Sequence, residues 1–215
     1  MINILFNTKD KRKTPVFFNF TLYENLDDVK KPKSKNYIWE DYGLVNRIVG
    51  NPKYDLPKQM IMVTNCKSIN FDFFDWKHDW KIFSEEFLNF AKEQGLPEEN
   101  YQISKLYTIT LKGEEIINKK YYILRIHTFD DALFNFDKIE SVPSKSFKGA
   151  FFYPKLDIIE EMTKSRGIFF LDSFCYSNTI ILTNNALKIA KELNFQPMEY
   201  YSSIAYIKAY NQFFG

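Results

Sequence analysis

A short module that occurs twice, 99 residues apart, constrains the fold of this chain more than any other feature of its sequence. The first copy covers residues 82–96 and the second covers residues 181–195. Five aligned pairs are identical: Ile82/Ile181, Leu88/Leu187, Ala91/Ala190, Lys92/Lys191 and Glu93/Glu192. A chance likeness between two amphipathic helices is the alternative, because helical periodicity recurs in many sequences.

The residues at the two ends of each copy predict how its helix begins and ends. Ser84 and Thr183 are suitable N-cap residues, because a hydroxyl accepts a hydrogen bond from a free backbone N–H. Gly95 and Asn194 lie at the same offset, and both residue types tolerate the left-handed conformation that ends helices. Each copy is therefore predicted to be the end of a strand, a cap, a helix of about three turns and an abrupt stop.

The remaining patterns predict more strands than helices. Besides the module helices, one short helix is expected at residues 156–164 and a solvated loop at 27–36. Strands are expected at residues 16–23, 60–63, 101–111, 119–128, 167–171, 179–182 and 198–207. Because strands and helices do not alternate regularly, the prediction is an α+β fold with mixed or antiparallel sheets and a few short helices, not a doubly wound sheet.

The length of 215 residues is enough for one large domain or two small ones. We expect a single α+β domain over residues 1–215, possibly built from two related halves that each carry a strand–helix–strand module. Residues 1–70 are a possible N-terminal lobe, and residues 71–215 are a core that holds both copies of the module.

Charge and cysteine content narrow the class of partner and compartment. The chain has 29 basic and 27 acidic residues, so it lacks the electrostatic character of proteins that bind nucleic acid or anionic membranes. No apolar run approaches the ~20 residues of a membrane helix, and the N-terminus lacks the features of a signal peptide. Cys66 and Cys175 do not make a disulfide framework, and Cys175 is expected to be a small buried side chain. A cytoplasmic protein is the expectation.

No standard catalytic or metal motif is present. The two histidines, His78 and His127, lack the spacing of a zinc site, and there is no glycine-rich phosphate loop or nucleophile elbow. Asp75, His78 and Asp79 could offer three metal ligands, but a polar edge beside two tryptophans is the simpler interpretation. We therefore expect no cofactor and no metal, and a small-molecule ligand is not expected.

One enzyme alternative stays open around His127, which precedes Asp130 and Asp131. A histidine beside carboxylates can act as a general base, and this hypothesis requires a concave pocket that holds all three groups. A histidine at a strand end that is bonded to backbone is the structural alternative.

Residues 70–80 are richer in aromatic and acidic side chains than any other part of the chain. One interpretation is a docking surface with rigid aromatic anchors and negative charge that suit a basic partner. The other is a strand or turn with its rings in the core and its acids in water. For the first interpretation, the candidate partner-binding residues are Asp72, Asp75, Trp76, Asp79 and Trp80.

Residues 82–201 resemble the DUF1629-like bacterial polymorphic-toxin immunity proteins. The resemblance rests on the repeated module, on Tyr121-Tyr122 within residues 113–126, and on the run Asp130-Asp131-Ala132-Leu133 followed by Asp137 and Ser141. Three positions depart from the pattern of that group: Arg125 replaces Asn, Phe134 replaces the second Asp of Asp-Ala-Leu-Asp, and Pro197 replaces Gly.

The resemblance implies an immunity protein that binds one cognate toxin domain and neutralises it in the cytoplasm of the producing cell. It implies no catalytic residues, because such proteins are thought to act by binding. Two alternatives remain: the enzyme with a site near His127, and a carbohydrate-binding module that uses some of the 22 Phe, 14 Tyr and 3 Trp residues. A nucleic-acid partner is disfavoured, because contacts with phosphate dominate such binding and this chain has a nearly balanced charge.

Overall fold

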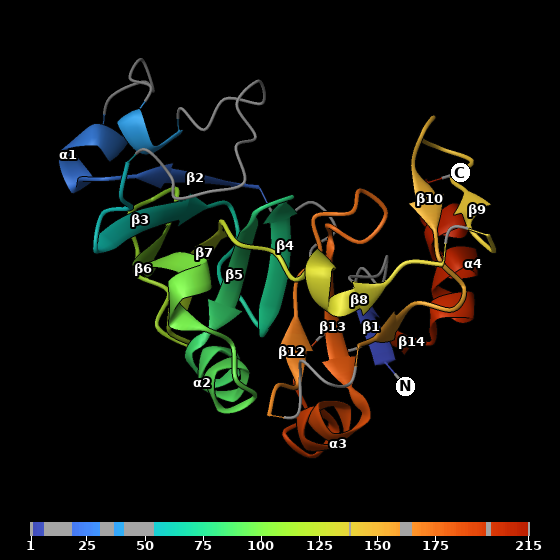
Figure 1. The fold of residues 1–215 in the computed structure, drawn as a ribbon. Coiled ribbons are helices and arrows are strands. Elements are labelled where there is room, and N and C mark those ends of the chain that lie inside the picture. The colour runs from blue at the N-terminus through green and yellow to red at the C-terminus, as the bar shows by residue number, and fades with distance from the viewer. Residues whose placement is uncertain are drawn as a thin grey trace.

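The computed structural model describes residues 2–6, 19–30, 37–40, 54–137, 139–159, 165–196 and 199–214. Within these ranges the chain forms two main sheets, two short β-ribbons and a few helices (Figure 1). The predicted α+β class with mixed and antiparallel sheets is confirmed.

The larger sheet has six strands in the order β2-β3-β6-β7-β5-β4. Its strands are β2 (Phe20–Tyr23), β3 (Gln59–Thr64), β4 (Phe73–Lys77), β5 (Trp80–Ser84), β6 (Tyr101–Thr110) and β7 (Tyr121–Ile126). Only the β3–β6 pair is parallel; the other pairs are antiparallel. All five residues of β5 are buried, which places this strand inside the molecule.

The smaller sheet has four antiparallel strands in the order β12-β13-β1-β14. Its strands are β1 (Ile2–Phe6), β12 (Ile168–Phe169), β13 (Thr179–Thr183) and β14 (Tyr200–Tyr201). The N-terminal strand β1 therefore pairs with strands from the C-terminal third of the chain, while β2 and β3 belong to the other sheet. The described residues before position 70 contribute to both sheets.

The helices and ribbons lie around these sheets (Figure 1). The α-helices are α1 (Leu26–Val29), α2 (Glu85–Glu93), α3 (Asn184–Glu192) and α4 (Ser203–Phe214), and the 3-10 helices are η1 (Ile38–Glu40), η2 (Glu98–Asn100) and η3 (Asp131–Leu133). One ribbon pairs β9 (Val142–Pro143) with β10 (Phe151–Phe152), and the other pairs β8 (Phe134–Asn135) with β11 (Asp157–Ile158). None of the helices in the described ranges combines the length and apolar character that crossing a bilayer requires.

Both copies of the repeated module have the predicted local structure. The Ser84 hydroxyl accepts a hydrogen bond from the Phe87 N–H at 3.1 Å, and the Thr183 hydroxyl accepts one from the Ala186 N–H at 3.3 Å. The strands β5 and β13 end at these caps, and the helices α2 and α3 follow at once.

The two helices also end as predicted. Gly95 has a φ of 78° and Asn194 has a φ of 55°, which is the left-handed region. Asn194 is the one non-glycine residue with positive φ among the described residues. An asparagine adopts this conformation with less strain than most side chains do, and a glycine adopts it with none.

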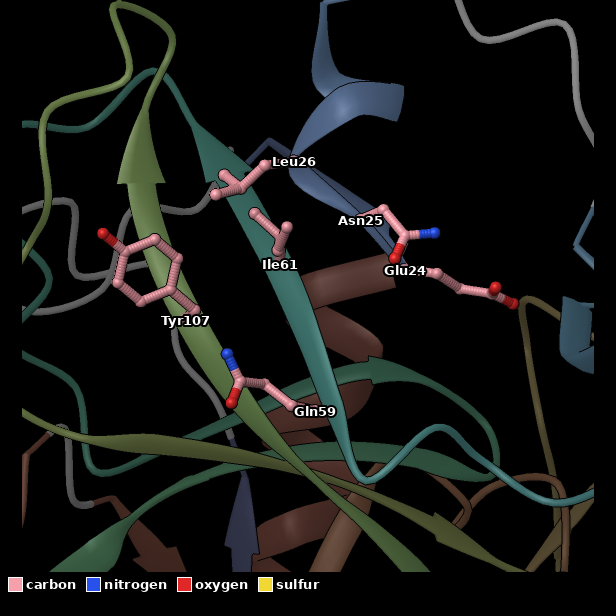
Figure 2. A pocket seen from close by; sticks show the side chains of 6 residues that line it. All are labelled: Glu24, Asn25, Leu26, Gln59, Ile61 and Tyr107. Carbon is pink, nitrogen blue, oxygen red and sulfur yellow. The ribbon is translucent and has the colours of Figure 1, made fainter.

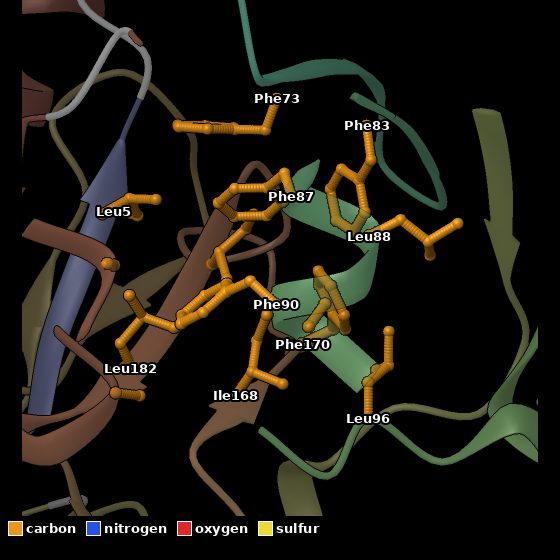
Figure 3. Close-up of a cluster of buried hydrophobic side chains, with 14 of the residues drawn as sticks. Leu5, Phe73, Phe83, Phe87, Leu88, Phe90, Leu96, Ile168, Phe170 and Leu182 are labelled. Atoms are coloured by element: carbon orange, nitrogen blue, oxygen red, sulfur yellow. The ribbon is translucent and has the colours of Figure 1, made fainter. Parts of the chain in front are cut away.

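The two modules pack against each other in one core. Buried side chains of this cluster come from both sheets and from α2 and α3. Figure 3 shows Phe87 and Phe90 of α2 with Leu5 and Leu182 of the smaller sheet beside them. Phe87 lies at its centre, with ring centroids 4.8 Å from Phe83 and 4.9 Å from Phe195. Ile168 and Leu182 reach the same cluster from the smaller sheet.

Gly167 links the modules through its backbone. Its N–H donates to the Gln94 carbonyl at the end of α2 (2.8 Å), and its carbonyl accepts from the Thr183 N–H at the start of α3 (3.0 Å). A Cβ at this position would lie 2.9 Å from the Ala186 Cβ, closer than two non-bonded carbon atoms approach in proteins. A glycine is therefore required where the two modules meet.

The predicted strands at residues 60–63, 101–111, 119–128 and 179–182 are confirmed as β3, β6, β7 and β13. The strand expected at 167–171 is shorter and covers only β12, and the strand expected at 16–23 is seen as β2, with residues 16–18 outside the described ranges. The loop expected at 27–36 is wrong at its start, because α1 includes residues 27–29; residues 31–36 lie outside the described ranges.

Two predicted elements in the C-terminal third are wrong. The helix expected at 156–164 contains strand β11 instead, and residues 160–164 lie outside the described ranges. The strand expected at 198–207 ends at β14, and α4 begins at Ser203. Tyr206 and Tyr210 are both buried and lie four residues apart on one face of α4. This helical spacing continues beyond the segment that was assigned to a strand.

Candidate functional site

Residues 70–80, the predicted docking stretch, form β4, a turn and the start of β5 at one edge of the larger sheet. Its rings mostly enter the core: Phe71, Phe73 and Trp80 are 0%, 3% and 5% exposed. Trp76 is partly exposed, and its ring lies 5.8 Å from that of Trp80. The rings of this stretch therefore lie mostly in the core, as the strand interpretation predicts.

The first acid of the stretch, Asp72, is buried and fully engaged. Its carboxylate accepts hydrogen bonds from the Ser84 hydroxyl at 2.8 Å and the Gln196 N–H at 2.7 Å, and it forms an ion pair with Lys119. Asp72 thus connects the cap of α2 to the segment that follows α3. This position gives it a structural role that the sequence pattern did not indicate.

The second acid, Asp75, pairs with a buried lysine. Lys81 is 2% exposed and donates to the Asp75 carboxylate, to the His78 carbonyl (3.0 Å) and to the Ser177 carbonyl (2.7 Å). Burial raises the pKa of Asp75, and the charge of Lys81 opposes that rise. Because Ser177 precedes β13, Lys81 joins the edge of the larger sheet to the smaller sheet.

The third acid, Asp79, lies in the turn between β4 and β5 and is partly buried. Burial raises the pKa of its carboxyl group, and within the described part of the chain no donor reaches its Oδ2 atom. Nearby, His78 pairs with the carboxylate of Asp172 at 2.5 Å. Of the five predicted contact residues, Asp75, Trp76 and Asp79 reach the surface in part, whereas Asp72 and Trp80 are buried. Their contact with a partner stays a prediction.

The three side chains of the enzyme alternative, His127, Asp130 and Asp131, bond to other residues and not to one another. His127 is 8% exposed; its backbone N–H donates to the Asn100 carbonyl, and its Nδ1 lies 3.2 Å from the Thr128 hydroxyl. Burial, together with the nearby Arg125 charge, lowers the pKa of His127. This burial and these contacts fit the structural alternative, a histidine that packs at the end of a strand.

The two carboxylates beside it hold the segment that leads into the smaller sheet. Asp130 accepts two hydrogen bonds from the Arg166 guanidinium at 2.7 and 2.6 Å, and one from the Phe170 N–H at 2.9 Å. Asp131 accepts from the N–H groups of Asp172 at 2.7 Å and Ser173 at 3.1 Å. Because these contacts occupy the carboxylate oxygens, the geometry does not favour the enzyme alternative.

The remaining chemical expectations concern metals and cysteines. Across the described ranges, no three side chains of His, Cys, Asp or Glu are grouped closely enough to hold a metal ion, so Asp75, His78 and Asp79 do not form a ligand set. Cys175 is 1% exposed, as predicted, and burial raises the pKa of its thiol to about 11. Cys66 is also a free thiol.

A pocket of about 410 Å³ lies beside α1, over β3 and β6 of the larger sheet (Figure 2). It is lined by Glu24, Asn25, Leu26, Gln59, Ile61 and Tyr107. Ile61 and Tyr107 are neighbours across the parallel strand pair. Sequence analysis missed this pocket, because its residues come from three separate segments. The Glu24 carboxylate at its rim already accepts a hydrogen bond from the Trp39 indole at 2.7 Å, and none of its lining residues is a nucleophile paired with a base.

A family model described as Immunity protein 43 matches residues 6–215 of the chain. No curated protein matches it. The match confirms the immunity-protein class expected from the sequence, and it extends over residues 6–81, where the sequence carried no resemblance. The DUF1629-like group is a finer assignment that the match does not test.

Proposed function

Because this chain belongs to the Immunity protein 43 family, we propose that it binds one cognate bacterial toxin domain and neutralises it, which protects the cell that produces both. The family match over residues 6–215 is the observation that carries this proposal. Neutralisation occurs by binding, without a catalytic step and without a cofactor. The structural hydrogen bonds of Asp130 and Asp131 leave these carboxylates poorly suited to the catalytic role that the enzyme alternative gives them.

The proposed site of action is the cytoplasm of the producing cell, where an inhibitor meets its toxin before export. Two free cysteines support this compartment, because a reducing environment keeps thiols unpaired. Specific inhibitor pairs that block a toxin bind tightly, and a dissociation constant in the nanomolar range or below is expected.

The test is capture of the partner from the host. The tagged full-length chain is expressed in its own host and purified, and co-purifying proteins are identified by mass spectrometry. We expect a stoichiometric fragment from the C-terminal end of a large secreted protein. An unrelated protein with the same tag is the control for adhesion to the resin.

A second step links binding to protection. The captured fragment is expressed in a sensitive strain with and without this chain, and growth is measured. Co-expression is expected to restore growth. Absence of a specific fragment, or a captured fragment whose toxicity the chain does not relieve, would show that the proposal is wrong.

A further inference from the structure

The ribbon of β9 and β10 carries lysines and exposed aromatic rings. Residues 141–156 contain three lysines and no acidic residue, in a chain whose total charge is nearly balanced. Several rings on or beside this ribbon remain exposed instead of packing inside. Figure 1 shows β9 and β10 next to α4, on the side of the molecule opposite α1.

One side of the ribbon is anchored to the core. Phe152 of β10 is fully buried, and its ring centroid lies 5.0 Å from that of Tyr210 and 6.0 Å from that of Tyr206 on α4. Because successive strand residues point to opposite faces, Phe151 points away from this contact and is 42% exposed. The buried neighbour therefore holds an exposed ring in a defined position.

Besides Phe151, a pair of exposed rings lies at the turn of the ribbon. Phe147 and Phe174 have ring centroids 4.7 Å apart, and they are 37% and 46% exposed. Phe174 comes from the segment between β12 and β13, so two distant parts of the chain build this pair. Exposed apolar groups that gather at one place mark interaction surfaces more often than isolated ones do.

Two lysines of the ribbon turn accompany these rings in the sequence. Lys145 and Lys148 are exposed, and in the described structure neither pairs with a carboxylate, whereas Lys155 pairs with Glu140 at 2.6 Å. Two uncompensated lysines thus accompany three exposed phenylalanines. Aromatic anchors surrounded by charge of one sign suit a protein partner with charge of the opposite sign.

We propose that the ribbon face, defined as Lys145, Phe147, Lys148, Phe151 and Phe174, is a toxin-binding surface and that it contacts an acidic region of the toxin domain. This inference rests on the proposed function. It differs from the docking stretch expected from the sequence, which would suit a basic partner: there Asp72 and Asp75 already pair with Lys119 and Lys81 inside the protein.

An anionic membrane is the other macromolecule that lysines and exposed rings could contact. Membrane-binding basic segments usually carry four to eight basic residues, because each contributes only about 1 kcal/mol near the surface. Two unpaired lysines are too few for that mode, so a protein partner is favoured.

The charge component is tested with the double variant Lys145→Glu/Lys148→Glu. Its affinity for the captured toxin fragment, inactivated by mutation, is measured by calorimetry at low and high salt. We expect binding at least about tenfold weaker than wild type at low salt, because like charges then face each other. The matched control, Lys112→Glu/Lys188→Glu, changes the total charge equally at exposed positions outside the ribbon and is expected to bind as wild type does.

The aromatic component is tested with Phe147→Ser/Phe151→Ser, compared with Leu111→Ser/Ile117→Ser at two other exposed positions. We expect at least about tenfold weaker binding for the first pair only. Thermal unfolding midpoints are measured for the wild type and all variants. Equal midpoints of the lysine variants and the wild type show that the fold is retained. If the phenylalanine double variant unfolds, the lysine double variant alone decides the test.

The outcomes separate this inference from the proposed function. If the wild type binds the toxin and both ribbon variants bind equally well, the surface assignment is wrong and the function stands. If the wild type itself captures no toxin, the function fails and the assignment fails with it. Ribbon-dependent binding to phosphatidylserine vesicles with unchanged toxin affinity would also overturn the assignment.

Discussion

Two charged side chains of the larger sheet lie where a strand normally buries apolar groups. Lys81 is 2% exposed and Arg125 is 1% exposed. Arg125 donates to the carbonyls of Trp39 and Tyr54 and to the side chain of Gln102. A buried charge is tolerated only when partners satisfy it, and here backbone carbonyls from distant segments do so. The charged residues of β5 and β7 therefore attach neighbouring segments to the sheet.

Asp79 allows a test of pH dependence at a single residue. Burial raises its pKa above the usual value of 3.8, so the folded state binds the proton more tightly than the unfolded chain does. As pH rises from 3.8 through the raised pKa, the folded state therefore loses stability relative to the unfolded state. Asp79→Asn removes this titration and should be more stable than wild type at pH 7, with a smaller difference near pH 3.8.

The measurement is urea unfolding of both proteins across this pH range. Asp27→Asn, at an exposed position on α1, is the matched control for the removal of one carboxylate charge. A wild type that is more stable than Asp79→Asn at pH 7 would contradict the prediction. The same isosteric variant also tests the predicted toxin contact at this position, because it removes charge and keeps shape.

At the scale of elements, the caps of α2 and α3 use one geometry with different surroundings. The Thr183 hydroxyl caps α3, whereas the Ser84 hydroxyl caps α2 and also donates to the buried Asp72 carboxylate. The first function is local and could be predicted from the sequence. The second depends on a residue twelve positions away and on the packing of Lys119 and Gln196 around it.

Removal of the two hydroxyls should therefore have unequal effects. Thr183→Ala should lower the free energy of unfolding by about 1 kcal/mol, the usual value for a lost N-cap. Ser84→Ala should lower it by about 2 kcal/mol or more, because Asp72 also loses a donor while it stays buried. Denaturant unfolding measures both values, with Thr183→Ser as the conservative control. An effect of Ser84→Ala no larger than that of Thr183→Ala would rule out the additional role of the hydroxyl.

The wrong predictions at this scale have a common cause. Residues 198–207 combine aromatic and β-branched side chains, which favour strands, yet α4 forms because Tyr206 and Tyr210 pack on Phe6 and Phe152. Local propensity is a weak determinant when tertiary contacts favour another periodicity. The short ribbon strand β11 is likewise defined by its pairing with β8.

For the whole molecule, the single-domain organisation over residues 1–215 remains a proposal, and the shared core supports it. One hydrophobic cluster draws on both sheets and both module helices. Lys81 adds a polar link, because it donates to Asp75 on β4 and to the Ser177 carbonyl beside the smaller sheet. With so many contacts in common, the two sheets should unfold together.

The Lys81→Met variant tests this coupling. It leaves the partly buried Asp75 without its cation and should lower the free energy of unfolding by about 3–5 kcal/mol. All three tryptophans, Trp39, Trp76 and Trp80, belong to the larger-sheet side, so fluorescence reports that side while far-UV circular dichroism reports the whole fold. The variant should unfold at a lower denaturant concentration than the wild type. Within each protein, however, fluorescence and circular dichroism should share one midpoint.

The matched control is Lys188→Met, at an exposed position on α3, which should leave stability unchanged within about 0.5 kcal/mol. The double variant Lys81→Met/Asp75→Asn should recover part of the loss, because it removes the unpaired carboxylate. Separate fluorescence and circular dichroism transitions would show that the two sheets are independent units.

The sequence by itself determined what depends on neighbouring residues: the caps and stops of the two module helices, most strands of the larger sheet, and the burial of Cys175. These follow from hydrogen bonds and periodicities that span a few positions. Only the tertiary structure decided the pairing of β1 with β13, the burial of Asp72 and Lys81, the helical state of α4 and the exposure of the ribbon rings. Each of these depends on partners distant in sequence. Contacts with such partners can bury a charged residue that a local pattern places in solvent, and they can form a helix where local propensity favours a strand.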